Sequence, residues 1–562
     1  MKNAEVADLL QRMSILSEAA GEERFKSIAY WRAANTIRNL TEDIEVVWKQ
    51  GKLTDLPYVG EGIAKKIDEY LSTGHSTYLD KMQKKVPAAV FSLMAVPGIG
   101  PKTAYRLAKE AGVSSLEDLE KRLEEGMLLE ILGKENSRKI LEEIKKFKSR
   151  ERRLLLPEAE AVIESLQSHF TTKAVQVMVA GSYRRGKETI GDIDLISTDQ
   201  LAADALARFP RVGEVIERGN KRMSVKLVDG LQVDLRLFDQ DELGAGLLYF
   251  TGSKEHNIEL RNIAIKRGWK LNEYGLFDTK TGKRLAAKTE DDIYSELGLA
   301  YIPPELRENR GEIEAALAKR LPLLVEQKDL VGDLQMHSNW SDGQNTIKEM
   351  ATAAKSLGYS YIAITDHSLT ARIANGLSEE RFKRQWKEIE KLNEELYPFR
   401  ILKGAEVEIR GNGELDFPSE FLKEFDVVGA SIHQGYRQSP EKLTERVLKA
   451  LNNPEVNYLC HPTNRLIGQR EGHKIDLAKV IRAAKENGKW IEINAQPNRL
   501  DLNDFWAREA AKEGVKLLVN SDAHSTGELQ NMKYGVLVAR RAWLEKNHVV
   551  NTLSLKELTR LL

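Results

Sequence analysis

The sequence predicts a multidomain protein in which helical domains precede a mixed α/β region and a C-terminal β/α barrel. Three observations lead to this fold class. A short glycine-containing motif occurs twice near the N-terminus, a glycine-rich turn precedes paired aspartates near residue 190, and histidines and acids recur at the ends of apolar strands after residue 330. The 562 residues are enough for roughly three or four domains, each with its own core.

The composition is that of a soluble protein. Basic and acidic residues number 85 each, and the resulting net charge of zero neither supports nor excludes nucleic-acid binding. The single cysteine, Cys460, rules out an intrachain disulfide, and no apolar run approaches the ~18 residues of a membrane span. The first residues lack the apolar core of a signal peptide. We therefore expect a cytoplasmic monomer with no membrane partner.

Residues 1 to about 85 are predicted to form helices with short connections. A motif in this region recurs in form further along the chain, as Leu56-Pro57-Tyr58-Val59-Gly60-Glu61-Gly62-Ile63-Ala64 and Val96-Pro97-Gly98-Ile99-Gly100-Pro101-Lys102-Thr103-Ala104. In each copy a Gly-x-Gly segment opens an amphipathic helix. Backbone N–H groups at a helix N-terminus can bind a DNA phosphate without reading sequence. The two copies predict a DNA-binding surface.

A glycine-rich turn organises the middle of the chain. Its sequence is Gly181-Ser182-Tyr183-Arg184-Arg185-Gly186, and glycine lets backbone N–H groups approach an anion closely. The strand that follows places Asp192 and Asp194 on one face. Two converging carboxylates repel each other unless a cation lies between them, and their hard oxygen atoms suit Mg²⁺ or Mn²⁺. A phosphate-binding turn beside such carboxylates is typical of nucleotidyl transfer.

Two further patterns extend this site. Asp234 lies in an alternating strand, Leu231 to Leu237, whose apolar residues point to the opposite face. Asn257 and Arg261 are four residues apart and share one face of the next helix. Both can donate hydrogen bonds to the minor-groove acceptors that every base pair offers. Such contacts would test the geometry of a base pair without selecting its sequence.

Strand–helix repeats follow a connector at residues 303–328. Half of the ten histidines lie at the ends of the predicted strands, with acids near them; they are His337, His367, His433, His461 and His524. A β/α barrel builds its site from residues at the carboxyl ends of parallel strands. Histidines mixed with acids at these positions predict a site for several metal ions.

These motifs resemble the family X DNA polymerases, the polymerase β-like repair enzymes, in the bacterial and archaeal form that ends in a PHP (polymerase and histidinol phosphatase) domain. The resemblance covers the whole chain and includes the helix-hairpin-helix motif twice. It implies α-helical N-terminal domains, an α/β nucleotidyltransferase palm with a thumb, and a distorted TIM-like β/α barrel. The implied domains are a lyase-like helical domain at 1–85, a DNA-binding helical domain at 86–150, the palm at 151–240, a nucleotide-selection thumb at 241–316, a linker at 317–330 and the PHP domain at 331–562.

The resemblance also assigns roles to residues of the polymerase half. Asp192, Asp194 and Asp234 match the catalytic, metal-binding aspartates, with Mg²⁺ or Mn²⁺ as the metal. The nucleotide-binding positions are Ser182, Arg185, Arg153, Tyr249, Phe250, Gly252 and Asn257. The DNA-binding positions are Gly60, Gly62, Gly98, Gly100, Lys26, Tyr30, Arg261 and Arg236.

Lys66 falls where the family has the lysine that forms a Schiff base with a 5′-deoxyribose phosphate. Lys26 and Tyr30 fall at positions that hold a 5′-phosphate. Gly62, however, replaces a lysine that helps to bind this phosphate. We therefore expect a preference for gaps with a 5′-phosphate and only weak lyase chemistry.

In the PHP half the resemblance implies eight metal ligands, namely His337, Asp342, His367, Glu406, His433, His461, Asp522 and His524. These would bind two or three ions of Mn²⁺, Zn²⁺ or both. Gln335 stands where the first PHP motif usually has a histidine, and glutamine binds transition metals poorly. One metal is therefore expected to be weakly held. Cys460, beside His461, is interpreted as a small buried residue.

The sequence thus predicts a DNA polymerase that fills short gaps in repair, with a metal-dependent 3′–5′ exonuclease or phosphoesterase in the barrel. Its expected partners are dNTPs and gapped or primed DNA with a 5′-phosphate. Two alternatives stay open: a DNA-end phosphoesterase that uses the polymerase half as a targeting module, and a non-catalytic gap-binding scaffold. A related view makes the barrel a decayed domain that braces the polymerase. The intact palm aspartates argue against the first two.

Overall fold

The computed structural model describes residues 2–38, 40, 43–87, 89–94, 96, 98–149 and 153–562. The chain forms two compact units, Met1–Glu151 with Ser525–Gly527 and Arg152–His524 with Glu528–Leu562. Pro97 of the second repeated motif and the predicted domain boundary at 150 and 151 lie outside the described residues. Where the chain is described, no helix combines the length and the apolarity that crossing a membrane requires.

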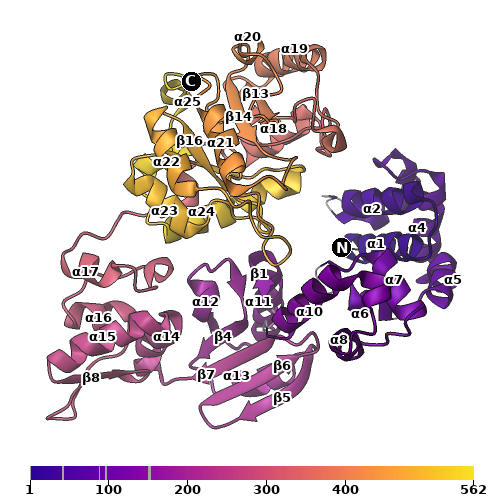
Figure 1. Cartoon of the computed structure of the whole chain (residues 1–562). Helices are drawn as coiled ribbons and strands as arrows, with labels where there is room; N and C mark the ends of the chain where they lie inside the picture. The colour runs from indigo at the N-terminus through magenta and orange to yellow at the C-terminus, as the bar shows by residue number, and fades with distance from the viewer. Residues whose placement is uncertain are drawn as a thin grey trace. The chain divides into compact units, whose positions relative to one another are not determined.

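The N-terminal unit is helical, as predicted, and is drawn from indigo to purple in Figure 1. Its described part contains the helices α1 (Asn3–Ala19), α2 (Arg24–Arg38), α3 (Ile44–Lys49), α4 (Glu61–Thr73), α5 (Thr77–Lys85), α6 (Ala89–Leu93), α7 (Pro101–Lys109), α8 (Leu116–Glu124), α9 (Leu129–Leu132) and α10 (Lys134–Ser149). Two hydrophobic clusters form its interior, and α1 contributes to both, through Leu10 and Met13 to one and through Leu16 to the other.

Both repeated motifs lead into a helix, which confirms the prediction. Gly60 is the N-cap of α4 and Gly100 is the N-cap of α7, both with extended backbones. Neither residue has a side chain that could cap the helix, so N–H groups in the first turns of α4 and α7 can face an anion, although Pro101 at the start of α7 has no N–H group. Gly98 adopts φ 92°, a conformation that favours glycine in this turn.

The palm is a five-stranded sheet in the order β2-β4-β7-β6-β5. Its elements are β1 (Leu154–Leu155), α11 (Leu156–Thr171), β2 (Met178–Val179), α12 (Gly181–Arg184), β3 (Thr189–Ile190), β4 (Asp192–Ser197), α13 (Ala202–Ala207), β5 (Val212–Arg218), β6 (Arg222–Leu227) and β7 (Gln232–Leu237). Ile193 and Leu195 of β4 pack in the cluster that contains residues of α11 and α13. Because side chains alternate along a strand, the aspartates of β4 lie on the other face of the sheet.

The thumb follows as helices around a three-stranded antiparallel sheet in the order β10-β9-β8. Its elements are α14 (Leu243–Thr251), α15 (Lys254–Lys266), β8 (Trp269–Asn272), β9 (Gly275–Asp278), β10 (Arg284–Ala286), α16 (Glu290–Glu296) and α17 (Glu312–Leu317). They enclose a hydrophobic cluster of their own, which includes Leu260, Leu276 and Ile293.

The C-terminal half is a parallel sheet of seven strands in sequential order. The strands are β11 (Gly332–Asp333), β12 (Tyr361–Ile364), β13 (Arg400–Glu408), β14 (Val427–Ser431), β15 (Tyr458–Leu459), β16 (Trp490–Asn494) and β17 (Leu517–Asn520). A parallel bridge between Met336 and Ala523 brings the segments after β11 and β17 together, so the sheet is a nearly closed barrel. This confirms the predicted β/α barrel.

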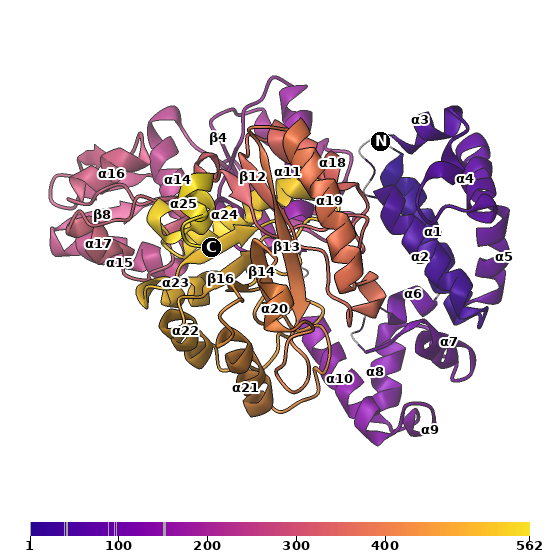
Figure 2. The same ribbon diagram turned by 90° about the horizontal axis from the view of Figure 1, so that it is seen from above.

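Helices cover the outside of the barrel, as Figure 2 shows for α18, α19, α21 and α22. The helices are α18 (Ile347–Ser356), α19 (Glu379–Glu395), α20 (Ser419–Leu422), α21 (Pro440–Leu451), α22 (Leu477–Glu486), α23 (Asp504–Lys512), α24 (Met532–Arg541) and α25 (Leu555–Leu558). In β12, Tyr361 and Ala363 belong to one cluster while Ile362 and Ile364 belong to another. This alternation separates the barrel interior from the layer beneath the helices. The cluster that contains Ile362 and Ile364 also includes the core residues of the palm, so palm and barrel pack together.

Candidate active sites: a palm carboxylate cluster and a histidine-rich metal centre

The palm brings the three predicted aspartates together. Parallel pairing of β4 with β7 places Asp194 opposite Asp234, and ligand oxygens of Asp192, Asp194 and Asp234 lie within 4.8 Å of one another. Asp234 is buried, and its carboxylate accepts hydrogen bonds from Ser224 Oγ and, at 2.8 Å, from Gln232 Nε2. The three carboxylates are arranged as ligands for a divalent cation.

Electrostatics support a cation at this position. Burial, followed by the charges of Asp192 and Asp234, raises the pKa of Asp194 to about 7. A carboxyl group in this situation is ionised easily only when a positive charge lies beside it. Gly181 makes the close approach possible: it adopts φ +65°, and a Cβ added there would lie 2.1 Å from Asp194 Oδ2. Any larger residue would displace the acid.

The two arginines of the turn have different partners. Arg184 forms a bidentate ion pair with Glu290 of the thumb, at 2.8 and 2.7 Å. Arg185 donates to Glu308 Oε1 at 3.0 Å and to the Thr251 carbonyl at 2.7 Å. Ser182 Oγ is buried and has no hydrogen-bond partner among the described residues. Among the described residues the turn therefore offers an unpaired hydroxyl to an anion, and Glu308 is a carboxylate that would compete with an anion for Arg185.

The end of α14 carries the predicted nucleotide-binding residues Tyr249, Phe250 and Gly252, here called the nucleotide-sugar motif. Asn257 donates to the carbonyls of Tyr249, at 2.6 Å, and Gly252, at 3.3 Å, so its amide holds this turn. A Cβ at Gly252 would lie 2.4 Å from Asn257 Oδ1, which explains the glycine. Phe250 packs beside the cluster that contains Phe238, whereas Tyr249 contacts Phe250 edge-on. The base-pair-checking role of Asn257 and Arg261 stays a prediction.

Two other predicted arginines lie on different sides of the palm. Arg153 donates to Thr189 Oγ1 at 2.9 Å and to the Thr189 carbonyl at 2.7 Å, beside the short strand β3. Arg236 lies over the ring of Phe250, 5.5 Å from its centroid. Its Nη1 atom is buried without a hydrogen-bond partner in the described part of the chain. Only Arg236 thus presents an unsatisfied donor near the nucleotide-sugar motif.

In the N-terminal unit the candidate lyase residues do meet. Lys66 Nζ lies 5.8 Å from the ring centroid of Tyr30 and 5.2 Å from that of Tyr78, and it donates to the Gly62 carbonyl at 2.9 Å. Lys26 Nζ lies 5.9 Å from the Tyr78 ring. Burial, helped by the charge of Lys26, lowers the pKa of Lys66. A lowered pKa favours the neutral amine that attacks a carbonyl carbon.

The barrel gathers the predicted metal ligands in one region, and four of the histidines approach Glu406. His337, His367, His433 and His461 each place a ring nitrogen 2.9 to 3.4 Å from a Glu406 carboxylate oxygen. Three groups of potential ligands have atoms within 4.8 Å: His337-Asp342-His367-His524, His367-Glu406-His433 and His337-Glu406-Asp522. Glu406 belongs to two of these groups, as a ligand that bridges metals would.

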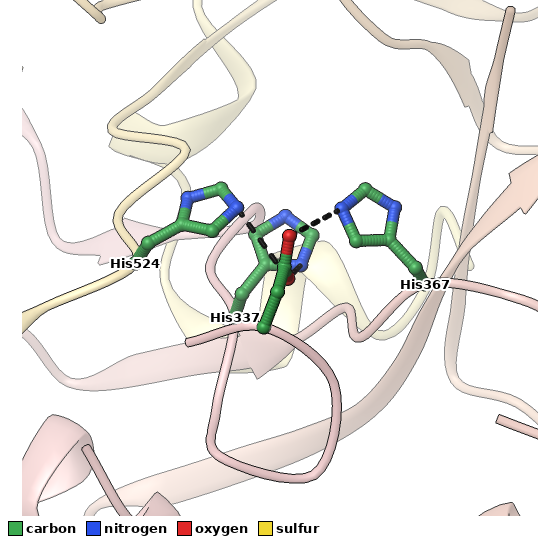
Figure 3. A group of neighbouring side chains, drawn as sticks. His337, His367 and His524 are labelled. Carbon is green, nitrogen blue, oxygen red and sulfur yellow. Dashed lines mark ion pairs between the residues drawn. The ribbon is translucent and has the colours of Figure 1, made fainter. Parts of the chain in front are cut away.

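Figure 3 shows the rings of His337, His367 and His524 gathered around one carboxylate. This is Asp342, whose oxygens lie 4.0, 3.7 and 3.6 Å from the three rings. Four buried atoms of the centre make no hydrogen bond within the described part of the chain: His337 Nδ1, His367 Nδ1, Glu406 Oε2 and His461 Nδ1. Buried polar atoms are normally paired. His337 Nδ1 lies 4.0 Å from Asp342 Oδ1 and His367 Nδ1 lies 3.3 Å from Glu406 Oε2, so metal ions fit as the missing partners of these atoms.

The side-chain oxygen of Gln335 is not oriented to bind a metal ion. Its Oε1 accepts hydrogen bonds from Tyr458 Oη and, at 3.5 Å, from Cys460 Sγ. The remaining amide nitrogen is buried without a partner among the described residues, and an N–H donor cannot bind a cation. Cys460 is buried, and burial raises the pKa of its thiol well above the usual value. The residue therefore remains a neutral thiol, in line with a packing role.

Sequence reasoning missed the residues that orient the ligands. Glu408 Oε2 accepts from the backbone N–H of His433 at 2.9 Å and lies 3.1 Å from its Nδ1. Glu492 Oε2 accepts from the backbone N–H of His461 at 2.6 Å. Glu408 follows the ligand Glu406 by two residues on β13, and this spacing places both on one face. That spacing was the available signal; Glu492 is preceded by no motif.

Comparison with known proteins agrees with this geometry. Sequence profiles match a helix-hairpin-helix domain at residues 1–76, a SAM-like helix-hairpin-helix tandem at 91–146, a DNA polymerase beta palm at 156–254, a DNA polymerase beta thumb at 246–308 and a PHP domain at 333–496. The predicted domain boundaries themselves stay predictions. These matches define the class: a polymerase β-type nucleotidyltransferase joined to a PHP domain.

Individual relatives narrow the class. The "DNA polymerase/3′-5′ exonuclease PolX" of Bacillus subtilis (strain 168) is 38% identical over 566 residues, 99% of this chain and 98% of that protein. A "Probable phosphatase" of Acetivibrio thermocellus is 36% identical over 194 residues, 33% of this chain and 75% of that protein. "DNA polymerase lambda" of Arabidopsis thaliana is 27% identical over 342 residues, 54% of this chain and 62% of that protein. The chain belongs to the family X DNA polymerases of the PolX type, which carry a C-terminal PHP domain.

Proposed function

We propose that this chain is a DNA polymerase that fills short gaps and carries a metal-dependent 3′–5′ exonuclease in its PHP barrel. The similarity to the Bacillus subtilis polymerase and exonuclease over nearly the full length supports both activities. The observation that carries the polymerase is the carboxylate cluster beside an unpaired Ser182 hydroxyl. Its substrates are dNTPs and gapped or primed DNA with a 5′-phosphate.

In the polymerase reaction Asp192, Asp194 and Asp234 would hold the metal, as Mg²⁺ or Mn²⁺. Ser182 and Arg185 bind the triphosphate, and Tyr249 and Phe250 pack against the sugar. The primer 3′-hydroxyl would lose its proton to solvent as its oxygen attacks the α-phosphorus, the bond between the α-phosphorus and the oxygen that bridges to the β-phosphorus would break, and pyrophosphate would leave. Bound divalent cations lower the pKa of the attacking group and stabilise the charge that develops on the phosphate, in the palm and in the barrel alike.

In the barrel, eight residues would hold two or three ions, for which Mn²⁺ or Zn²⁺ suits the mixed nitrogen and oxygen ligands. Glu406 is central, because four histidines approach it. Gln335 leaves the position near His337 and Asp522 with fewer ligands. A water molecule would add to the phosphorus of the terminal phosphodiester, the bond from this phosphorus to the 3′-oxygen of the preceding nucleotide would break, that oxygen would take up the proton that the water loses, and the terminal nucleotide would depart with its 5′-phosphate.

One experiment separates the two activities. DNA with a one-nucleotide gap and a 5′-phosphate is incubated with dNTPs and either Mg²⁺ or Mn²⁺. Asp234→Ala should lower gap filling by orders of magnitude and leave 3′-end degradation intact, whereas Glu406→Ala should do the reverse. Near-normal extension by Asp234→Ala would reject the palm assignment. Nuclease activity unchanged in Glu406→Ala and His433→Ala would reject the barrel as its source.

The N-terminal unit supports a weaker third activity. Lys66 lies in an aromatic pocket with a lowered pKa, and Lys26 lies beside the same Tyr78 ring. Glu22 accepts a hydrogen bond from Tyr78 Oη at 2.8 Å, which adds a negative charge near the place where a 5′-phosphate would bind. We propose that this pocket binds a 5′-phosphate and removes 5′-deoxyribose phosphate slowly.

A further inference from the structure

The phosphate-binding turn of the palm lies directly against the PHP barrel. Gly186 ends the turn with φ +64°, and a Cβ added there would lie 3.1 Å from the side chain of Leu537 on α24. A second contact between the two domains is the ion pair of Arg465, in the barrel, with Glu188, at 2.7 Å. The helix α24 therefore packs against the part of the palm that is proposed to bind the triphosphate.

Glu308 is the centre of a charge cluster at this junction. Its Oε1 atom accepts from Arg185 Nε and from Arg541 Nη1, each at 3.0 Å, and Lys187 Nζ lies 3.4 Å from its Oε2. The side chains of Arg185, Glu308 and Arg541 are 12%, 10% and 5% exposed. Although burial opposes it, the charges of Arg541, Arg185 and Lys187 hold the pKa of Glu308 at about 2. Glu308 is thus ionised, and two arginines share one of its oxygens.

Arg541 also holds the backbone of the turn. Its Nη1 donates to the Arg185 carbonyl at 2.8 Å, and its Nη2 donates to Asp504 Oδ2 at 2.8 Å. A single guanidinium from the barrel therefore fixes the position of Arg185 and neutralises the carboxylate that competes with the triphosphate for it. Planar guanidinium groups are suited to such simultaneous contacts, whereas an ammonium group is not.

We infer that Arg541 is a positioning residue for nucleotide binding: from the PHP barrel it sets the availability of Arg185 to the triphosphate. This inference rests on the proposed polymerase function and adds a requirement for the barrel that is independent of its metals. Without Arg541, Glu308 would retain Arg185 more strongly, and the Arg185 carbonyl would lose a charged donor. Both changes weaken binding of the dNTP in the ground state, so the effect falls on KM rather than on kcat.

The test compares full-length variants in steady-state gap filling at varied dNTP concentration. Arg541→Gln should raise KM for the dNTP about tenfold, with kcat within about twofold of normal, because it loses hydrogen bonds to charged groups. Affinity for gapped DNA should stay unchanged. Lys533→Gln is the matched control: Lys533 also lies on α24 and pairs with palm Glu160 at 2.7 Å, but it makes no contact with the turn among the contacts described here. It should retain a normal KM.

Arg541→Lys serves as the conservative variant and carries the test if Arg541→Gln does not fold; it should raise KM about threefold, because a lysine replaces only part of the contacts. Adding Arg541→Gln to Glu308→Gln should raise KM by less than Arg541→Gln does in the wild type, since the competing charge is already gone and only the bond to the Arg185 carbonyl remains to be lost. An unchanged KM in the Arg541 variants would overturn the inference. So would an equal rise in Lys533→Gln, or full additivity with Glu308→Gln.

Arg185→Gln separates this inference from the function on which it rests. If Arg185→Gln raises KM for the dNTP and the Arg541 variants do not, only the role of Arg541 is rejected. If Arg185→Gln leaves KM unchanged, the proposed contact between Arg185 and the triphosphate is wrong, and the role of Arg541 falls with it.

Discussion

Replacing Glu408 by glutamine should weaken the PHP metal centre without altering any of its ligands. Both carboxylate oxygens of Glu408 are in use. Oε2 accepts from the His433 backbone N–H at 2.9 Å and lies 3.1 Å from the His433 Nδ1. Oε1 accepts from the Gln434 backbone N–H at 3.2 Å and from Arg446 Nη2 at 3.1 Å. The side chain is 2% exposed, so water cannot replace these contacts.

The size of the effect follows from this geometry. A glutamine at this position has one oxygen that accepts hydrogen bonds and one NH₂ group that only donates them. In either orientation of the side chain, two of the four N–H donors that now face the carboxylate would therefore face this NH₂ group. Residues that orient a metal-binding histidine typically contribute about 10- to 100-fold to metal affinity or activity. This corresponds to about 1.4 to 2.8 kcal/mol. His433 would then lose the partner that fixes its ring, and Nε2 would be directed less well toward Glu406.

The assay is degradation of a 3′ end at increasing Mn²⁺ concentration. Glu408→Gln should shift the half-saturating Mn²⁺ concentration upward by about 10- to 100-fold, and excess Mn²⁺ should restore most of the rate. Gap filling should be normal. Glu414→Gln is the control, because Glu414 is an exposed acid nearby, 58% exposed, that pairs only loosely with Lys449 at 3.8 Å. An unchanged Mn²⁺ dependence in Glu408→Gln would refute the reasoning.

Three further predictions concern other parts of the chain. Borohydride trapping of 5′-deoxyribose phosphate should disappear in Lys66→Ala. In the wild type, trapping should rise with pH to a midpoint below 10.5, because the pKa of Lys66 is lowered. Lys26→Ala should move that midpoint upward, because the charge of Lys26 contributes to the lowered pKa. Gln335→His should increase the metal content of the purified protein, measured by elemental analysis, and an unchanged content would show that this position is not a ligand site. Glu290→Gln should destabilise the thumb by about 3 to 5 kcal/mol, because it leaves buried Arg307 without its carboxylate. In the wild type the pKa of Glu290 is lowered from 4.5 to about 2, so its contribution to the stability of the thumb is complete above pH 4.5 and is lost as pH falls toward 2. Hydrogen exchange of thumb amides measures both the loss of stability in Glu290→Gln and the pH dependence in the wild type. Glu290→Gln should not show this pH dependence.

Local periodicity was enough to predict the backbone that carries the two sites. The spacing of Asp192 and Asp194 placed both on one face of a strand, and β4 has its apolar residues in the opposite cluster, as expected. Histidines at strand ends were expected to meet because parallel strands end at the same rim, and the barrel brings all five into one centre. In both cases the short-range sequence pattern determines the face to which a side chain points, and the pairing of strands in the sheet determines which side chains lie close together.

Side-chain partners were not predictable in the same way. Arg153 was expected to help the triphosphate, but its guanidinium is bonded to Thr189. The pocket around Lys66 includes Tyr78 and the acid Glu22, which no motif indicated. These pairings join residues from different helices or strands, and their formation depends on the packing of whole elements. A sequence pattern with a period of two or four residues contains no information about them.

The adjacent arginines of the turn illustrate how a local motif acquires its meaning from distant segments. Neighbouring residues on a helix point about 100° apart, so Arg184 and Arg185 of the same short turn reach different partners. Arg184 binds Glu290 in the thumb, and Arg185 binds Glu308, which also binds Arg541 of the barrel. The turn is thereby fixed from two sides before any nucleotide is present. Arg184 makes two hydrogen bonds to Glu290, whereas Arg185 makes one to Glu308 and one to the Thr251 carbonyl, so we expect Arg185 to be released to a phosphate more easily than Arg184. On the proposed function, the same charge in the same motif thus anchors the thumb at Arg184 and binds the triphosphate at Arg185, and Arg541 of the barrel acts on the second of these roles.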